Sequence, residues 1–188
     1  NKLTGIINGI DNEHFTPSHD KLLEYPFANL TEKKLNKKSY LKEKSLKGIT
    51  KPLFIFIGRF TQQKGVDLLI NSLEQIASSD CNIAILGDGE EIYQEKIMKI
   101  VNEYDNIHFE FKYNEVLSHQ MYAAADFLLM PSLFEPCGLN QMIAMSYGSI
   151  PIVHKVGGLK DTVHDYKLFD NKSSKGYGIL FEKPSSDS

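Results

Sequence analysis

The chain has 188 residues, of which 41% are hydrophobic and 24% are charged, a composition typical of one soluble globular domain with its own core. Its formal net charge is −3, so there is no overall basic field and a nucleic-acid partner is not expected. No apolar run approaches the roughly 18 residues that a membrane span needs, and the first residues do not resemble a signal peptide.

The cysteine and lysine content indicates the cellular compartment and singles out one arginine. Two cysteines, Cys81 and Cys137, do not make a disulfide framework and favour a reducing compartment. The cytoplasm is therefore the expected location, or a plastid if the source is a plant. Of the 21 lysines and arginines, Arg59 alone is arginine. The chain starts at Asn1 without a methionine, and we interpret it as a piece of a longer protein.

Residues 18–50 form a lysine-rich segment in which the sequence predicts a surface helix over 32–46, expected to be amphipathic and solvated. From residue 53 onward, short apolar runs alternate with segments whose apolar residues recur at helical spacing. The expected strands are 53–57, 83–86, 107–111, 127–130, 150–153 and 178–181. The expected helices are 66–77, 93–104, 116–124, 138–147 and a short one after Gly157-Gly158, and 184–188 is expected to be a loop. This alternation predicts a Rossmann-like α/β domain, with a parallel sheet covered by helices on both faces.

In such a fold, ligands bind outside the carboxyl ends of the strands, so the loops that follow the strands are the candidate sites. The loop 58–65 places Arg59 and Lys64 five residues apart, between a strand and a helix. Arginine offers a planar fork for two phosphate oxygens, lysine adds a mobile charge, and the helix N-terminus adds N–H donors. From spacing alone, the loop is either a diphosphate site or a surface loop with two solvated cations.

The loop after 127–130 carries Glu135 just before the next expected helix. A carboxylate there could accept hydrogen bonds from sugar hydroxyls, although complementing the helix dipole is the simpler explanation on physical grounds alone. Gly157 and Gly158 would let the backbone approach a ligand closely. The six histidines show no metal-ligand spacing and no Asp-x-Asp pair occurs, so no metal site is expected.

Four motifs, in this order, resemble those of bacterial glycogen synthases and plant starch synthases. They are Asn-Gly-Ile-Asp at 8–11, Gly-Arg-Phe-Thr-Gln-Gln-Lys-Gly at 58–65, Phe-Glu-Pro-Cys-Gly-Leu at 134–139 and Gly-Gly-Leu-Lys-Asp-Thr-Val at 157–163. The resemblance implies that 1–188 is a single domain, the C-terminal, nucleotide-sugar-binding half of a two-domain glycosyltransferase B architecture. Residues 1–17 would then be an interdomain segment, 18–50 the lysine-rich helical segment and 51–188 the Rossmann-like core. The N-terminal domain and the terminal helices would lie outside this chain.

The resemblance also implies an activity. Such enzymes transfer glucose from ADP-glucose, sometimes UDP-glucose, to the 4-hydroxyl of an α-1,4-glucan, with retention of configuration and without a metal or other cofactor. By the match of motifs, Arg59 and Lys64 would hold the donor's diphosphate, and Glu135 would contact the donor glucose as a residue required for activity. The substrate-binding residues would be Asn8 near the sugar, Tyr113 stacked on the nucleobase, Cys137, Gly138, Leu139 and Asn140 through backbone N–H groups, and Gly157 and Gly158. The expected partners are ADP-glucose, the α-glucan and the N-terminal domain of the same protein, without which this piece is expected to be inactive.

Some positions depart from the family's pattern. Asn140 and Val156 stand where threonine is usual, and Lys112 precedes Tyr113 where glycine is usual. Met142 stands where the wider superfamily often has a second glutamate, as in the synthases and unlike relatives that act on sucrose-like acceptors. Two alternatives stay open: another retaining glycosyltransferase with a different donor or acceptor, and a non-catalytic nucleotide-binding module. The sequence does not indicate the oligomeric state.

Overall fold

Six parallel strands form one sheet in the computed structural model, which describes residues 5–166 and 176–184. The strands are β1 Leu53–Ile57, β2 Asn82–Gly87, β3 Ile107–Phe111, β4 Phe127–Met130, β5 Ile150–His154 and β6 Ile179–Phe181. Their order in the sheet is β3-β2-β1-β4-β5-β6, and every pairing is parallel. The predicted Rossmann-like α/β architecture is confirmed, while residues 1–4 and most of the expected C-terminal loop lie outside the described part.

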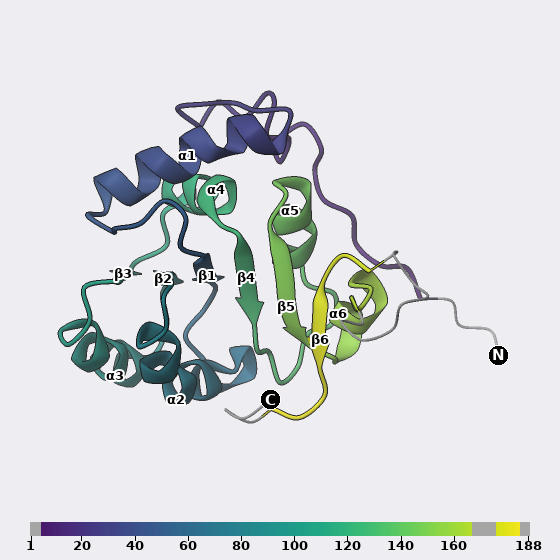
Figure 1. Ribbon diagram of the computed structural model, residues 1–188. Helices are drawn as coiled ribbons and strands as arrows, with labels where there is room; N and C mark the ends of the chain where they lie inside the picture. Colours follow the sequence, from purple (N-terminus) through teal and green to yellow (C-terminus); the bar gives the residue numbers. More distant parts are fainter. Residues whose placement is uncertain (1–4, 167–175, 185–188) are drawn as a thin grey trace.

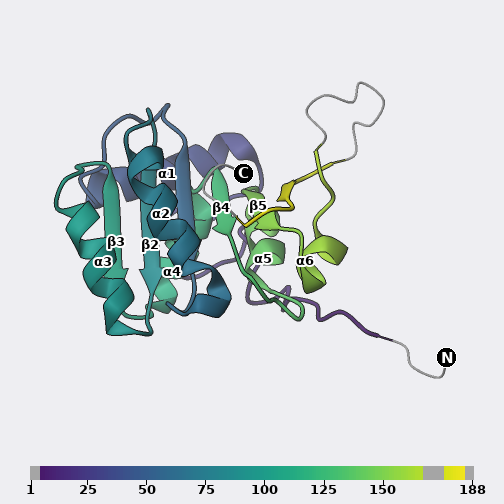
Figure 2. The same ribbon diagram turned by 90° about the horizontal axis from the view of Figure 1, so that it is seen from below.

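Helices cover both faces of the sheet (Figure 1). They are α1 Leu30–Glu43, α2 Val66–Ala77, α3 Glu91–Val101, α4 Glu115–Ala124, α5 Asn140–Ser146 and α6 Gly157–Thr162, with a short 3-10 turn, η1, over Gln62–Lys64. One apolar cluster joins α1, α4, α5 and α6 to the sheet, and a second joins α2 and α3 to the opposite face of β1–β3. Figure 2, seen from below, brings α2 and α3 to the front of the sheet.

Helix boundaries differ from the expected ones for local reasons. Helix α1 starts earlier than predicted because Asn29 caps it, its side chain accepting hydrogen bonds from the backbone N–H groups of Thr31 and Glu32. Helix α1 ends at Glu43, shortly before Ser45 adopts a φ of 57°. Helix α5 starts at Asn140 because Gly138 has a φ of 76°, outside the helical region.

The expectation that the lysine-rich helix is amphipathic and solvated was wrong. Lys33 is buried, and its Nζ donates to the carbonyl oxygens of Tyr122 and Tyr147, at 3.0 and 2.8 Å, and to Oγ of Ser149. Burial lowers the pKa of Lys33 to about 7. Lys37 reaches Asp126 with a distance of 2.6 Å between Nζ and Oδ2. Helix α1 is therefore attached to the α/β core by lysines as well as by apolar side chains.

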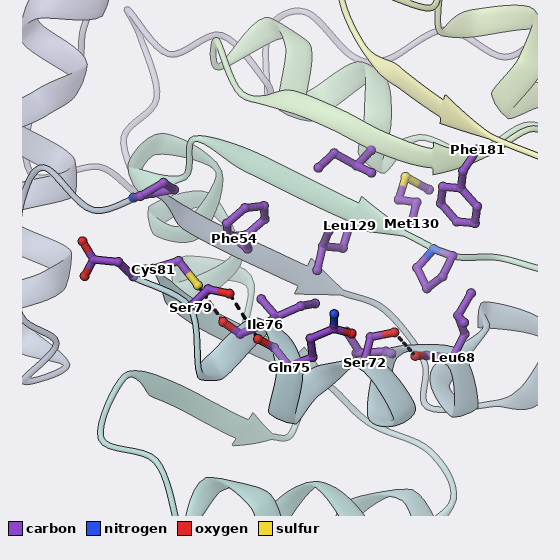
Figure 3. Close-up of a pocket in the computed structure, with 15 residues that line it drawn as sticks. Phe54, Leu68, Ser72, Gln75, Ile76, Ser79, Cys81, Leu129, Met130 and Phe181 are labelled. Atoms are coloured by element: carbon purple, nitrogen blue, oxygen red, sulfur yellow. Dashed lines mark hydrogen bonds between the residues drawn. The ribbon is translucent and has the colours of Figure 1, made fainter. Parts of the chain in front are cut away.

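The sheet face on the α2 side is hollowed next to that helix (Figure 3). The groove is lined by apolar side chains from α2 and from the strands, among them Leu68, Ile76, Phe54, Leu129 and Phe181. None of the residues that the sequence assigns to a donor site lines it. In the part of the chain that the structure describes, no helix combines the length and apolarity required to span a bilayer.

Candidate functional site

The candidate site lies where β1 and β4 are neighbours at the middle of the sheet. The strand order runs outward from this point in both directions, so the loops that follow the two strands turn toward opposite faces, and in folds of this class the ligand crevice lies between two such loops. We call residues 58–65 the β1 loop and residues 131–138 the β4 loop. The sequence placed its catalytic candidates in these two loops, and the fold makes the loops neighbours.

Three hydrogen bonds join the β1 loop to the β4 loop. The backbone N–H of Leu133 donates to the carbonyl oxygen of Gln63 at 2.9 Å. The side-chain amide of Gln63 donates to the carbonyl oxygen of Phe134 at 3.2 Å. Nζ of Lys64 donates to Oε2 of Glu135 at 2.6 Å. The two loops are thereby fixed to each other before any ligand is considered.

Lys64 and Glu135 form the most buried ion pair across this crevice. The side chain of Glu135 is 7% exposed and that of Lys64 is 24% exposed. Oγ of Ser132 donates to the same carboxylate oxygen at 3.2 Å. A charged hydrogen bond of this kind is strong and directional. Glu135 therefore holds Lys64 in place at the mouth of the crevice, a contact that the sequence did not predict.

Arg59 is placed differently from Lys64. Its neighbour Phe60 is fully buried, and the Phe60 N–H donates to the carbonyl oxygen of Asp88 while its own carbonyl accepts from Glu90. The backbone on one side of Arg59 is thus anchored, yet its side chain is exposed. Within residues 5–166 and 176–184 the guanidinium makes no hydrogen bond or ion pair. An unpaired guanidinium on an anchored loop is available to bind an anion.

The backbone after Glu135 also offers free donors. Among the described residues, the N–H groups of Cys137, Gly138 and Leu139 have no acceptor. Gln141 is fully buried, and its amide donates to the carbonyl oxygens of Cys137 and Gly138 at 3.1 and 3.0 Å. Asn140 ties the same segment to β1, because its side-chain amide donates to the carbonyl oxygen of Ile57 at 2.7 Å. These contacts fix the backbone conformation that orients the three N–H groups.

The glycine pair has a packing role that the sequence did not indicate. Gly157 has a φ of 46°, and a Cβ there would lie 1.9 Å from the carbonyl oxygen of Glu135. The N–H of Gly158 donates to that carbonyl oxygen at 3.0 Å, and a Cβ on Gly158 would lie 2.4 Å from Cα of Cys137. Only glycine fits at either position, because the start of α6 rests directly on the β4 loop.

Two predicted substrate contacts lie at the edges of this arrangement. Tyr113 is 58% exposed and follows β3, two strands away from β1, which is roughly 10 Å along the sheet edge. Asn8 is exposed in the N-terminal segment, residues 5–17, where its carbonyl oxygen lies 4.0 Å from Sγ of Cys137. In Figure 1 this segment descends past α5 toward α6. Neither residue contacts the Lys64–Glu135 pair in the described part of the chain.

The structure adds supporting residues that sequence patterns did not reveal. Ser132 holds the carboxylate of Glu135, and Nδ1 of the buried His154 lies 2.8 Å from the carbonyl oxygen of Ser132. Gln141 holds the following turn and also donates to Oγ1 of Thr162 at 2.9 Å. All three are polar and buried, which sets them apart from ordinary core residues. Their partners are mostly backbone carbonyls, which leave no mark in the sequence.

A parallel α/β sheet with cationic, carboxylate and free N–H groups at its switch point defines a domain of the Rossmann-like class. Residues 37–188 match the family described as glycosyl transferases group 1, and the chain belongs to this family. The domain is of the type found in the glycosyltransferase B architecture, as the resemblance implied.

Similar proteins share most of this chain but are much longer. It is 41% identical to a glycogen synthase of Cellvibrio japonicus over 97% of this chain and 38% of that protein. It is also 41% identical to a glycogen synthase of Streptococcus uberis, over 95% and 38% of the two chains. The chain therefore spans about 38% of the length of these relatives.

Solved structures agree with the fold. The catalytic domain of starch synthase IV from Arabidopsis thaliana, bound to ADP and acarbose, superposes with a TM-score of 0.89 at 36% identity, over 97% of this chain and 39% of that one. The C-terminal domain of the LpcC glycosyl transferase from Francisella tularensis superposes with a TM-score of 0.63 at 20% identity, covering 95% and 83% of the two chains. This second likeness concerns the fold alone.

Proposed function

We propose that this chain is the donor-binding half of a glycogen or starch synthase, which transfers glucose from ADP-glucose to the 4-hydroxyl of an α-1,4-glucan with retention. The observation that carries the proposal is the joining of the β1 and β4 loops by Lys64 and Glu135, with Arg59, unpaired among the described residues, in the same loop as Lys64. The likeness to a starch synthase bound to ADP and acarbose supports the same donor and acceptor classes.

In this proposal the cations act on the leaving group. As the bond between glucose C1 and the diphosphate oxygen breaks, negative charge collects on the diphosphate. Arg59 can take two phosphate oxygens through its planar fork, and Lys64 adds a second positive charge. Preorganised charges of this kind stabilise a transition state strongly because they need no rearrangement during the reaction.

Glu135 has two tasks in the same scheme. It holds Lys64, and in this scheme its carboxylate accepts a hydrogen bond from the donor glucose. The acceptor's 4-oxygen attacks C1 from the face that the diphosphate leaves, which retains the configuration. The proton of the acceptor hydroxyl passes to the departing phosphate oxygen, so the step needs no protein nucleophile. The free N–H groups of residues 137–139 supply further donors to the donor's phosphates or sugar.

The proposal also covers the cofactor requirement, the rest of the protein and the cellular compartment. The charge for the diphosphate comes from Arg59 and Lys64, so we assign no metal or other cofactor to the transfer. The rest of a longer protein would supply the glucan-binding wall of the cleft, reached through the N-terminal segment. Cys81 and Cys137 are free thiols, which suits a reducing compartment such as the cytoplasm.

A donor and acceptor panel tests this function on the full-length protein that carries this chain. Transfer of labelled glucose from ADP-, UDP- and GDP-glucose is measured with glycogen, with sucrose-type acceptors and without acceptor. We expect incorporation into glycogen with ADP-glucose as the preferred donor. Transfer only to a non-glucan acceptor would identify a different retaining glycosyltransferase, and nucleotide binding without transfer to any acceptor would identify a binding module.

A further inference from the structure

A second cluster of polar side chains lies between the N-terminal segment and α4. It consists of His14, Glu115 and His119, whose candidate ligand atoms, one from each side chain, all lie within 4.8 Å of one another. Glu115 and His119 are four residues apart on α4 and so share one face of the helix. His14 comes from a position 101 residues away from Glu115, and its Nε2 lies 3.2 Å from Oε1 of that residue. Only the tertiary fold brings these groups together.

The ring of His119 provides the main evidence that this cluster is a binding site. Its side chain is 1% exposed, and its Nδ1 lies 2.7 Å from Oδ2 of Asp20. That carboxylate also accepts a hydrogen bond from the hydroxyl of Tyr147. The other ring nitrogen, Nε2, is buried and has no partner among the described residues. Buried polar atoms are nearly always paired, and this nitrogen is one of five buried side-chain atoms among the described residues that have no partner.

The hydrogen bond to Asp20 fixes the chemistry of that nitrogen. When Nδ1–H of a neutral imidazole donates to a carboxylate, the lone pair is on Nε2. A carboxylate that orients a histidine in this way is the usual partner of a metal-bound imidazole. Phe15 stacks on the His119 ring with centroids 5.0 Å apart, which further holds the ring in place. His119 is therefore oriented as a metal ligand would be.

We propose that His14, Glu115 and His119 bind a divalent transition-metal ion of the Zn²⁺ type. Two imidazole nitrogens and one carboxylate oxygen are a ligand set that suits Zn²⁺, with a water molecule in the fourth position. In a tetrahedral site the ligand atoms are about 3.4 Å apart, given metal–ligand bonds of about 2.1 Å. The pair from His14 and Glu115 is already near this separation, both side chains are exposed, and the centroid of the His14 ring lies 5.0 Å from that of His119.

The metal would attach the N-terminal segment to the body of the domain. His14 lies on this segment and the other two ligands lie on α4, so one ion crosslinks them. The segment also carries Asn8, whose carbonyl lies beside Cys137 at the edge of the donor crevice. The ion is thus a structural clip, separate from the transfer chemistry and independent of the function proposed above.

Calorimetric titration with ZnCl₂ tests the site on the protein after a chelator has removed bound metal. We expect one ion per chain, and binding at least about 10-fold weaker in His14→Ala and in Glu115→Gln. Both residues are exposed, so these variants should fold normally. His19→Ala, at an exposed histidine five residues from His14 and outside the cluster, is the matched control and should bind as the parent does.

A spectroscopic readout identifies the geometry. Co²⁺ in place of Zn²⁺ should give the intense visible absorption of a tetrahedral site, and His14→Ala should remove it. The proposal is overturned if the protein binds no Zn²⁺, or if binding is unchanged in both His14→Ala and Glu115→Gln. Binding that is lost in the His19→Ala control instead would show adventitious capture by surface histidines and would equally overturn it.

Discussion

The ion pair of Lys64 and Glu135 determines how the crevice can receive an anion. With a distance of 2.6 Å between Nζ and Oε2, Glu135 offsets the charge of Lys64 but leaves its other N–H donors available. Arg59, which has no partner among the described residues, contributes the uncompensated positive charge. Glu135 thus fixes the position of Lys64, and in the proposed function Arg59 supplies the fork that a diphosphate requires.

The fork can be tested separately from the charge. Arg59→Lys keeps the positive charge but loses the bidentate geometry, so we expect glucose incorporation by the full-length protein to fall by about 10²–10³-fold. Lys34→Arg, on the exposed side of α1, is the matched control and should leave the rate unchanged. Near-normal turnover of Arg59→Lys would remove Arg59 from the donor site.

Gly157 offers a test of the contact between α6 and the β4 loop. An added Cβ would lie 1.9 Å from the carbonyl oxygen of Glu135, at a φ of 46°. We expect Gly157→Ala to lower the free energy of unfolding by about 1–3 kcal/mol, measured by urea denaturation. Gly5→Ala, where a Cβ meets nothing within 4 Å, should change it by less than about 0.5 kcal/mol. Equal stabilities of the two variants would contradict this account of the turn.

At the scale of elements, α1 shows how a polar helix can be part of a core. Its buried residues include Lys33, Asn36 and Lys37 as well as Tyr40 and Leu41. The long aliphatic stems of the lysines cover apolar surface, while their ammonium groups reach carbonyl oxygens and a carboxylate. Fixed acceptors thus replace water around these charges. The helix is held by specific hydrogen bonds, and its attachment should depend on protonation.

Lys33 makes this dependence measurable. Burial lowers its pKa to about 7, with a smaller opposing effect of Asp126 and a further lowering by Lys37. In the unfolded chain its pKa is near 10.4. The unfolded chain therefore binds more protons between these two values, and the free energy of unfolding increases as the pH rises through that range. We expect a gain on the order of 2 kcal/mol between pH 7 and pH 9.

Urea denaturation at pH 7 and at pH 9 tests this expectation. Lys33→Met should abolish the gain, because the titrating group is gone, whatever its effect on stability at either pH. Lys34→Met, at the exposed neighbouring position, should keep it. A gain of the same size in Lys33→Met would show that another group is responsible.

The sequence predicted the elements well and the contacts between them poorly. Apolar periodicity located all six strands within a residue or two, because burial on both faces of a parallel sheet leaves continuous apolar runs. It also placed Arg59, Lys64 and Glu135 in loops at the correct edge. It missed the burial of Lys33 and the role of Gln141, since their partners are mainly backbone carbonyls. His14 and Glu115 are 101 residues apart, and no spacing rule reaches that far.

At the scale of the whole molecule, the proposed function treats this chain as one wall of a cleft. The crevice between the β1 and β4 loops opens at the sheet edge, and a glucan acceptor would need a surface facing it. We therefore expect the 188-residue chain to fold and to bind ADP, but not to elongate glucan. Glucose incorporation and an ADP-dependent rise in melting temperature measure the two properties on one sample.

The two readouts separate two kinds of error. Steady elongation by this chain alone would refute the idea that catalysis requires a second wall. A melting temperature that ADP does not raise, in a chain that circular dichroism shows to be folded, would place the nucleotide elsewhere. Arg59→Lys in this chain should reduce the ADP-dependent rise in melting temperature, which would attribute that rise to binding at Arg59.

The strand order has a further consequence for folding. Strands β1–β3 and β4–β6 are each continuous in the chain, and within the sheet the two sets pair only where β1 lies beside β4. Two residue pairs are in register at this seam, compared with five between β1 and β2. Such halves often open as separate cooperative units in hydrogen exchange. Opening along this seam would separate Lys64 from Glu135, so a ligand that bridges the two loops would slow amide exchange on both sides of the seam.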